Sequence, residues 1–338
     1  MDGARPDLPW ESLVASDEQM YGSRIVRVEG GTGDGIRLLE VWTPSGLQLE
    51  FVLDRALDLH TVRFRGQPIS WLGPPGLRSR HAYEASGFGW LRTFHGGLLL
   101  TCGLEHIGNP ATADGSEHAP PDDRQIHHGE HGRISHQGAS LDRCEVVRDV
   151  QSHFSIVGHV TQAALYGEQF RLRREYRVSL LRPRISLTDT VTNVGPLPTR
   201  HGMLYHLNFG CPLVDAAASY ALDTAEGRVG ASFGPCSAAA PEQVDACEPA
   251  ADDDGRSHAS IENVAVGIRV DFAYATATLP VLLVWRLPRV RANVLGLAPA
   301  SHRPPDAGEP LEPGSQRTYD WELELSATSG WPPEDSEG

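Results

Sequence analysis

Apolar and polar residues alternate along two stretches of the chain, residues 169–180 and 319–325. In the first stretch Phe170, Leu172 and Tyr176 are separated by arginines and a glutamate. A period of two places successive side chains on opposite faces of a β-strand, so one face of each stretch is expected to lie in a core. Shorter runs favour further strands at 25–28, 36–42, 47–53, 62–64, 154–160, 185–191, 264–272 and 281–285.

Glycine and proline punctuate these runs. The chain holds 35 glycines and 25 prolines, and many of them fall between the expected strands, where they favour turns. Many short strands separated by turns are typical of a large antiparallel sandwich or barrel, so the sequence predicts an all-β fold. We expect one domain over residues 1–325 and a disordered acidic tail at 326–338.

Charge and cysteine usage restrict the partners. The net charge of −15 repels phosphate backbones and anionic lipid surfaces, so neither nucleic acid nor a membrane is expected as a partner. The five cysteines are widely spaced and odd in number, which indicates reduced thiols in a cytoplasm. The first ten residues lack the basic and apolar segments of a leader. The remaining expectation is a monomer or homodimer that acts on a small molecule.

Several motifs carry groups suited to proton transfer. His206 lies in a strand-like run beside Tyr205 and Asn208, and an imidazole suits proton transfer near neutrality. A histidine in such a run is also common in cores. The companion motifs are a segment at 90–104 that contains His95-Gly96-Gly97, the triplet His131-Gly132-Arg133, and the late segments 296–299 and 311–314.

This ordered set of motifs resembles the aldose 1-epimerase (galactose mutarotase-like) superfamily, and within it the DUF4432 branch, from about Arg55 to Leu325. The resemblance implies a mutarotase-type β-supersandwich, a carbohydrate substrate and no cofactor. It also implies that His206 protonates the ring oxygen of a sugar and that His131 helps to hold the ring. A late glutamate would accept the proton of the anomeric hydroxyl, but the matching position is Ala298.

Other residues are candidates for sugar binding. A guanidinium donates in a planar fork suited to neighbouring oxygens, which makes Arg133, Arg92 and Arg55 candidates. For Arg55 and Arg92 an ion pair with Asp54 or Asp58 is an equal alternative. His95 and Asn208 are further candidates for the same pocket, and Trp71, Trp90 and Tyr205 could stack on a sugar, although packing in a core explains His95 and each of the aromatic residues as well.

Residues 127–136 are rich in histidine and contain Glu130, a composition that suits zinc. The glycines at 129 and 132 favour a loop, and the helical spacing of a zinc-protease motif is absent. We therefore expect no metal. The long segment 109–128 could act as a lid, and 237–257 is expected to be a solvated surface insertion.

Alanine cannot accept a proton, so the activity depends on another base. Asp306, Glu309, Glu312 and His302 are the candidates near Ala298 in the sequence. The sequence predicts a sugar-binding, aldose 1-epimerase-like protein that opens the ring of a free sugar or sugar derivative by acid–base chemistry. The alternatives are a non-catalytic carbohydrate sensor and an isomerase or epimerase of a modified sugar.

Overall fold

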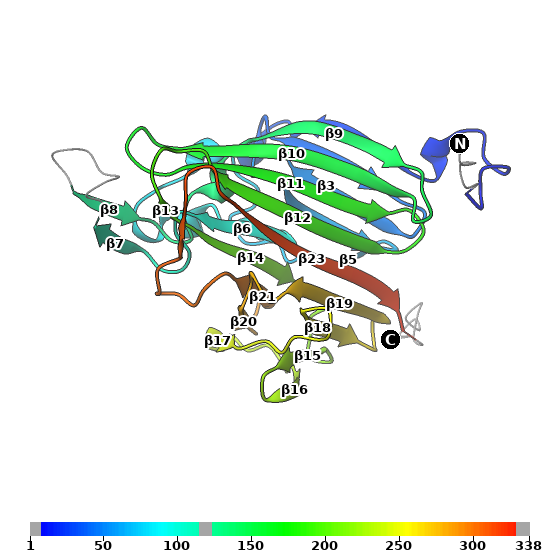
Figure 1. Cartoon of the computed structure of the whole chain (residues 1–338). Helices are drawn as coiled ribbons and strands as arrows, with labels where there is room; N and C mark the ends of the chain where they lie inside the picture. The colour runs from blue at the N-terminus through cyan, green and yellow to red at the C-terminus, as the bar shows by residue number, and fades with distance from the viewer. Residues whose placement is uncertain (1–7, 115–123, 329–338) are drawn as a thin grey trace.

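The largest element of the structure is a nine-stranded antiparallel sheet in the order β16-β15-β18-β19-β23-β12-β11-β10-β9. A computed structural model describes residues 8–114 and 124–328. In Figure 1 this sheet forms a curved layer across the molecule, with the N-terminal strands behind it. Its strands are β9 (Ala139–Val147), β10 (His153–Ala163), β11 (Gln169–Ser179), β12 (Arg184–Asn193), β15 (Ser219–Thr224), β16 (Gly227–Ser232), β18 (Arg256–Asn263), β19 (Ile268–Ala275) and β23 (Gln316–Ala327).

Two five-stranded sheets pack with it. The N-terminal sheet contains β1 (Gly22–Arg27), β2 (Arg37–Trp42), β3 (Leu47–Val52), β4 (Asp58–Phe64) and β5 (Gln67–Pro68) in chain order. The other, here called the cleft sheet, has the order β17-β20-β21-β14-β6. Its strands are β6 (Leu99–Leu104), β14 (Gly202–Phe209), β17 (Gln243–Cys247), β20 (Val281–Leu287) and β21 (Val294–Ala300).

Short elements complete the described chain. Two small two-stranded sheets pair β7 (Ala111–Asp114) with β8 (Gln125–His128) and β13 (Thr199–Arg200) with β22 (Pro310–Leu311). The described helices are 3₁₀ turns: η1 (Asp17–Gln19), η2 (Gly31–Gly33), η3 (Arg80–Ala82), η4 (Gly87–Arg92) and η5 (Ile134–His136). Over the described residues no helix is long and apolar enough to cross a bilayer. The prediction of an all-β antiparallel fold is confirmed.

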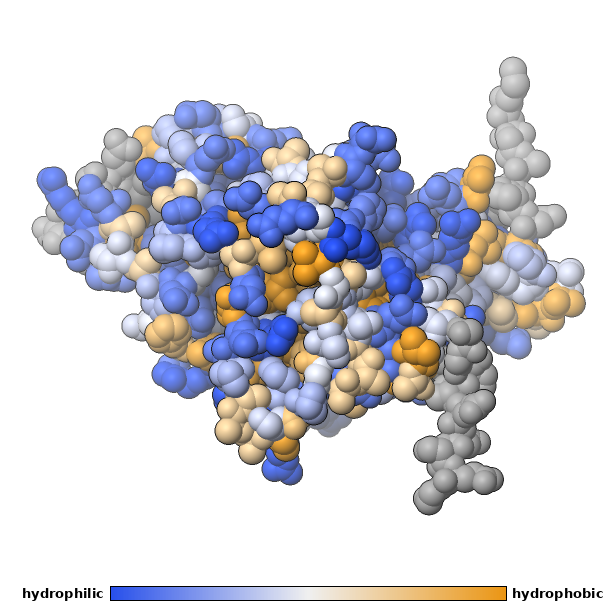
Figure 2. Space-filling model, turned by 90° about the horizontal axis from the view of Figure 1, so that it is seen from below, coloured by the Kyte–Doolittle hydropathy of each residue, from blue (hydrophilic) through white to orange (hydrophobic). Residues whose placement is uncertain are grey.

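Burial follows the alternation seen in the sequence. In β11 the side chains of Phe170, Leu172 and Tyr176 are fully buried, whereas Arg171 and Arg173 face solvent. The main apolar cluster draws side chains from the nine-stranded, N-terminal and cleft sheets. Seen from below, apolar side chains gather near the middle of the molecular surface and hydrophilic residues surround them (Figure 2).

A buried charge cluster ties the three large sheets together. Arg174 occupies an inward position of β11 and is fully buried. Its guanidinium donates to Asp58 of β4 at 2.6 Å, to Asp189 of β12 at 2.7 Å and to the Thr101 hydroxyl of β6 at 2.7 Å. The Tyr205 hydroxyl of β14 donates to Asp189 at 2.8 Å. The cleft sheet supplies two hydroxyls to this cluster, and because a hydrogen bond to a charged group contributes about 1.5–3 kcal/mol, the cluster helps to hold the cleft sheet on the others.

Four expectations from the sequence require correction or lie outside the described residues. The strand expected at 264–272 is interrupted, because residues 264–267 form a turn between β18 and β19. The surface insertion expected at 237–257 contains β17, which extends the cleft sheet by pairing with β20. Strand β23 continues to Ala327, beyond the expected boundary at 325, whereas 329–338 and the centre of the expected lid, 115–123, lie outside the described residues. The single domain over 1–325 stays a prediction.

Candidate active site

The cleft sheet carries an open cleft of about 710 Å³ on the face turned away from the main core. The volume is typical of a small-molecule site. Strands β14, β17, β20 and β21 form one side, and η4 and the loops around Phe94, Gly108, His131 and Pro304 form the rest. The lining residues are Phe88, Trp90, Leu91, Phe94, Gly108, Asn109, Glu130, His131, Leu204, His206, Glu242, Val244, Ala246, Leu283, Trp285, Ala298, Arg303, Pro304 and Pro305.

His206 reaches the cleft because strand β14 alternates. Leu204 and His206 line the cleft, and Tyr205 between them points into the main core. The His206 ring lies between two aromatic rings, with centroids 5.4 Å from Phe94 and 5.3 Å from Trp285. Burial lowers the pKa of His206 to about 4, although the Asn208 side chain acts in the opposite direction. His206 is therefore neutral at physiological pH.

His131 approaches His206 from a tight loop, and the centroids of the two rings are 6.0 Å apart. His131 has a φ of 56° and is followed by Gly132 at φ 69°, where a Cβ would lie 2.3 Å from the Gly103 carbonyl oxygen. Only glycine fits that position. The Gly108 amide donates to His131 Nδ1 at 3.2 Å, so the neutral ring carries its proton on Nε2. Burial, and then the nearby His206, lower the pKa of His131 to about 3.

Glu130 is a cleft residue that the sequence analysis considered only as a metal ligand. It is 9% exposed, and no described residue donates a hydrogen bond to its Oε2. Burial, and then the charge of Glu242, raise the pKa of Glu130 to about 7. Glu242 itself accepts a hydrogen bond from Trp285 Nε1 at 2.7 Å. The cleft therefore contains a carboxyl group whose pKa suits proton transfer near neutrality.

Ala298 lines the cleft from β21 and is 3% exposed. The residues proposed to replace its missing carboxylate do not line this cleft. His302 and Asp306 line a separate cavity of about 440 Å³, and Glu309 pairs with Arg317 at 3.0 Å. Glu312 is exposed in a turn. Proximity in sequence to Ala298 was misleading, because β21 ends at Ala300 and the loop that follows places Arg303 and Pro304 in the cleft but His302 and Asp306 in the other cavity.

The sequence profile of a family described as a domain of unknown function, DUF4432, matches residues 33–324. The chain belongs to the DUF4432 family. No curated protein is significantly similar in sequence to this DUF4432 chain.

Solved structures share the fold. A provisionally named aldose 1-epimerase from Klebsiella pneumoniae is 21% identical, with a TM-score of 0.77 over 92% of this chain and 89% of its own. A galactose mutarotase-like protein from Clostridium acetobutylicum is 12% identical, with a TM-score of 0.64 over 92% and 100% of the two chains. A galactose 1-epimerase from Lactobacillus acidophilus is 11% identical, with a TM-score of 0.57 over 91% and 99%. The DUF4432 chain therefore has the galactose mutarotase-like sandwich fold.

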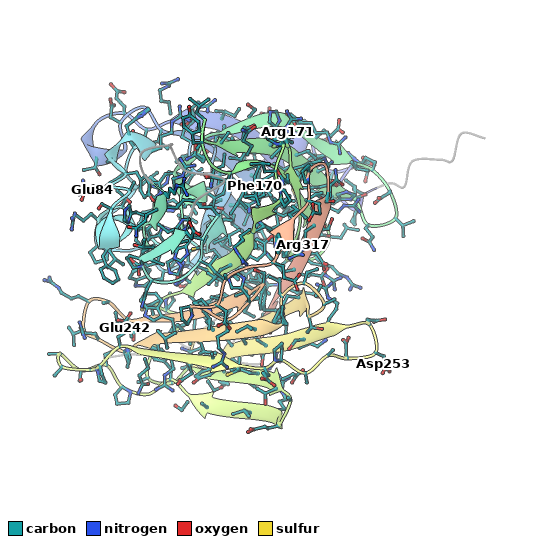
Figure 3. The ribbon with its side chains drawn as sticks, turned by 60° about the vertical axis from the view of Figure 1, so that its left-hand side comes forward. Glu84, Phe170, Arg171, Glu242, Asp253 and Arg317 are labelled. Carbon is teal, nitrogen blue, oxygen red and sulfur yellow. The ribbon has the colours of Figure 1, made fainter. Side chains whose placement is uncertain are left out.

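Two of the predicted sugar-binding arginines form ion pairs outside the cleft. Arg133 pairs with Glu168 and, at 3.3 Å, with Glu105, and these carboxylates line the separate 440 Å³ cavity. Arg92 is exposed and pairs with Glu84 at 2.8 Å. Figure 3 shows Glu84 well apart from Glu242, which borders the cleft. Although Arg92 belongs to η4, its neighbour Leu91 takes the cleft position.

The third arginine, Arg55, is fully buried and holds backbone together. Its guanidinium donates to the carbonyl of Ser135, to the carbonyl of Arg78 at 3.2 Å and to that of Thr93 at 3.4 Å, and contacts His136 Nε2 at 3.1 Å. The alternative ion pair with Asp54 or Asp58 is not formed, because those carboxylates bind Arg37 and Arg174.

The remaining polar candidates support the cleft from behind. His95 is fully buried, and its ring centroid lies 5.0 Å from that of His60. Asn208 donates to the carbonyls of Gly97 at 3.0 Å and His206 at 2.9 Å. These contacts, with those of Tyr205 in the charge cluster, fix the strand that presents His206. Tyr205 in particular cannot stack on a ligand in the cleft, because it occupies the opposite face of β14.

Aromatic rings line the cleft as expected, although the set differs. Trp90 stacks on Phe94 with centroids 4.5 Å apart, and both line the cleft together with Trp285. Trp71 packs behind Phe94 and Trp285. The histidine-rich segment is dispersed: His128 stacks on His106 and His136 on Tyr83. Within residues 8–114 and 124–328, no three or more metal-binding side chains are grouped to hold an ion.

Proposed function

We propose that the cleft binds a free aldose and interconverts its anomers through ring opening. This reaction needs one group that protonates the ring oxygen and another that accepts the proton of the C1 hydroxyl. The proposal depends mainly on Glu130, whose buried carboxyl shares the cleft with His206 and has a pKa of about 7. The shared fold with proteins named as aldose 1-epimerases supports the same substrate class.

The roles of the two groups follow from their pKa values. With a pKa near 7 for Glu130 and near 4 for His206, the cleft between these pH values holds a protonated carboxyl and a neutral imidazole. The opposite distribution of the proton is disfavoured, because the pKa of His206 lies below that of Glu130. Glu130 is thus assigned as the donor and His206 as the acceptor, the reverse of the role that the resemblance implied for His206.

The proposed reaction moves two protons and breaks one bond. Glu130 gives its proton to the ring oxygen as the bond from C1 to that oxygen breaks, and His206 takes the proton of the C1 hydroxyl. The open-chain aldehyde turns about the bond between C1 and C2. Closure from the other face returns both protons and yields the other anomer. The Nε2–H of His131 is positioned to donate a hydrogen bond to the sugar, and Trp90, Phe94 and Trp285 offer aromatic surface to its C–H groups.

The decisive experiment measures anomer exchange by NMR over a panel of aldoses, as a function of pH. The rate should be highest between about pH 4 and pH 7 and fall on both sides, because His206 must be neutral and Glu130 protonated. Glu130→Gln keeps the shape of the side chain but should lower the rate by about 10²–10⁴-fold. An unchanged rate in that variant would refute the assignment.

Glu242→Gln is the matched control, because it changes a second cleft carboxylate that remains bonded to Trp285. The variant should retain most of the maximal rate. Its rate should begin to fall at a lower pH than in the unchanged chain, because the negative charge of Glu242 is one cause of the raised Glu130 pKa. A large loss of maximal rate in Glu242→Gln would shift the catalytic role to Glu242.

A non-catalytic sugar-binding protein is the second candidate, and Ala298 is the observation that favours it. A chain that binds an aldose in this cleft but does not accelerate exchange at any pH would support this function over an epimerase. We propose a cytoplasmic location for either function, on the basis of the widely spaced cysteines.

A further inference from the structure

The mouth of the cleft exposes large apolar side chains. Phe88 and Leu91 of η4 are 54% and 48% exposed, and Val244 of β17 is 59% exposed. All three line the same cleft, although η4 and β17 are far apart in the chain. Exposed apolar side chains that converge on one cavity indicate a ligand with an apolar part.

Six of the nineteen described lining residues carry an ionisable or amide side chain, namely Asn109, Glu130, His131, His206, Glu242 and Arg303, and three of these already make a hydrogen bond. Glu242 is bonded to Trp285, Arg303 donates weakly to the Ala246 carbonyl at 3.5 Å, and His131 Nδ1 accepts from Gly108. The predicted arginines lie elsewhere, with Arg133 and Arg92 in ion pairs. An unmodified hexopyranose carries a hydroxyl on nearly every carbon, and each hydroxyl that leaves water without a partner weakens binding.

We propose that the substrate of this cleft is a deoxy aldose, in which a hydrogen replaces a hydroxyl and leaves an apolar methyl or methylene group. The reacting end of the sugar lies at Glu130 and His206, and the apolar group lies against Phe88, Leu91 and Val244. The apolar group gains from burial there, and the sugar has one hydroxyl fewer that needs a partner. This inference rests on the proposed function and names the substrate class of the same site.

The test compares sugars that differ in a single hydroxyl. D-galactose is paired with its 6-deoxy form D-fucose, and L-mannose with its 6-deoxy form L-rhamnose. Binding is measured by calorimetry at about pH 5.5, which lies between the pKa values of the two reacting groups. We expect the deoxy sugar of at least one pair to bind roughly tenfold or more tightly than its partner.

Two mouth variants locate the selectivity. The selectivity is the dissociation constant of the hydroxylated sugar divided by that of its deoxy form. Phe88→Ser and Val244→Ser should each reduce this ratio severalfold, mainly by weakening the binding of the deoxy sugar. Val150→Ser is the matched control, because Val150 is 93% exposed in the turn between β9 and β10 and does not line the cleft. The ratio should be unchanged in the control.

The outcomes separate this inference from the function on which it rests. If the hydroxylated sugars bind as tightly as the deoxy sugars and are interconverted, the substrate class is wrong and the proposed function stands. If none of the four sugars binds, the inference is overturned, and if no aldose of the NMR panel is interconverted either, the proposed function is overturned as well. Sedimentation velocity tests whether a second copy of the chain covers the mouth of the cleft instead. A dimer that dissociates in Phe88→Ser, with sugar selectivity unchanged, would also overturn the inference.

Discussion

Ala298→Glu returns a carboxylate to the position where the resemblance places a base, and its first effect should fall on His206. Ala298 shares the cleft face of β21 with Gly296, where a Cβ would lie 3.4 Å from His206 Cε1. Alternate residues of a strand are about 6–7 Å apart, so the new carboxylate can lie about 6 Å from the imidazole. At that distance, with an effective dielectric constant of about 20, the attraction is about 3 kcal/mol.

This attraction favours the protonated imidazole and therefore raises the pKa of His206. Reorientation and solvent reduce the effect, and we expect a rise of about 1–2 units from the value of about 4 in the unchanged chain. The assay is an NMR titration of the His206 ring proton. Ala298→Gln is the control, because it has nearly the same size and no charge, and it should leave this pKa unchanged.

The same substitution should rescue a chain that lacks Glu130. With a carboxylate at position 298 as acceptor and His206 protonated more often, Glu130→Gln/Ala298→Glu should exchange anomers about 10²–10⁴-fold faster than Glu130→Gln alone. In the otherwise unchanged chain the gain should be smaller, because Glu130 already transfers a proton. The reasoning is refuted if the His206 pKa does not rise, or if Ala298→Gln rescues equally well.

Three further predictions concern stability. Tyr205→Phe removes the hydrogen bond to the buried Asp189 and should lower the free energy of unfolding, measured in urea, by about 1.5–3 kcal/mol. Sugar affinity should not change. A loss of affinity at unchanged stability would contradict the structural role of Tyr205. Arg92→Gln breaks an exposed ion pair and should change both stability and exchange rate little, so a strong loss of sugar binding would restore Arg92 to the site. Burial raises the Glu130 pKa from 4.5 to about 7, so the folded chain holds this proton more tightly than the unfolded chain, and the free energy of unfolding should fall as the pH rises through this interval. Glu130→Gln should flatten that decline in urea melts recorded at several pH values. An unaltered dependence on pH would contradict the raised pKa.

The local pattern of the chain determined its elements and its family. Alternation identified β11 and β23 because a half-buried strand needs one apolar face, and the ordered motifs around His131 and His206 placed these imidazoles in one cleft. The same alternation carries a signal that was overlooked. Adjacent strand residues point to opposite faces, so Tyr205 and His206 cannot both line one cleft.

Only the tertiary structure decided which polar groups act together. Glu130 comes from a loop and Glu242 precedes an edge strand more than a hundred residues later, yet both line the assembled cleft. The arginines illustrate the same limit: Arg174 and Arg133 carry the same group, but the carboxylates packed around them assign one to the core and the other to an ion pair beside a second cavity. The sequence states the chemical type of each side chain, but burial and charged neighbours arise only when distant strands pack together. Burial and charged neighbours set the pKa of Glu130, and burial sets that of His206.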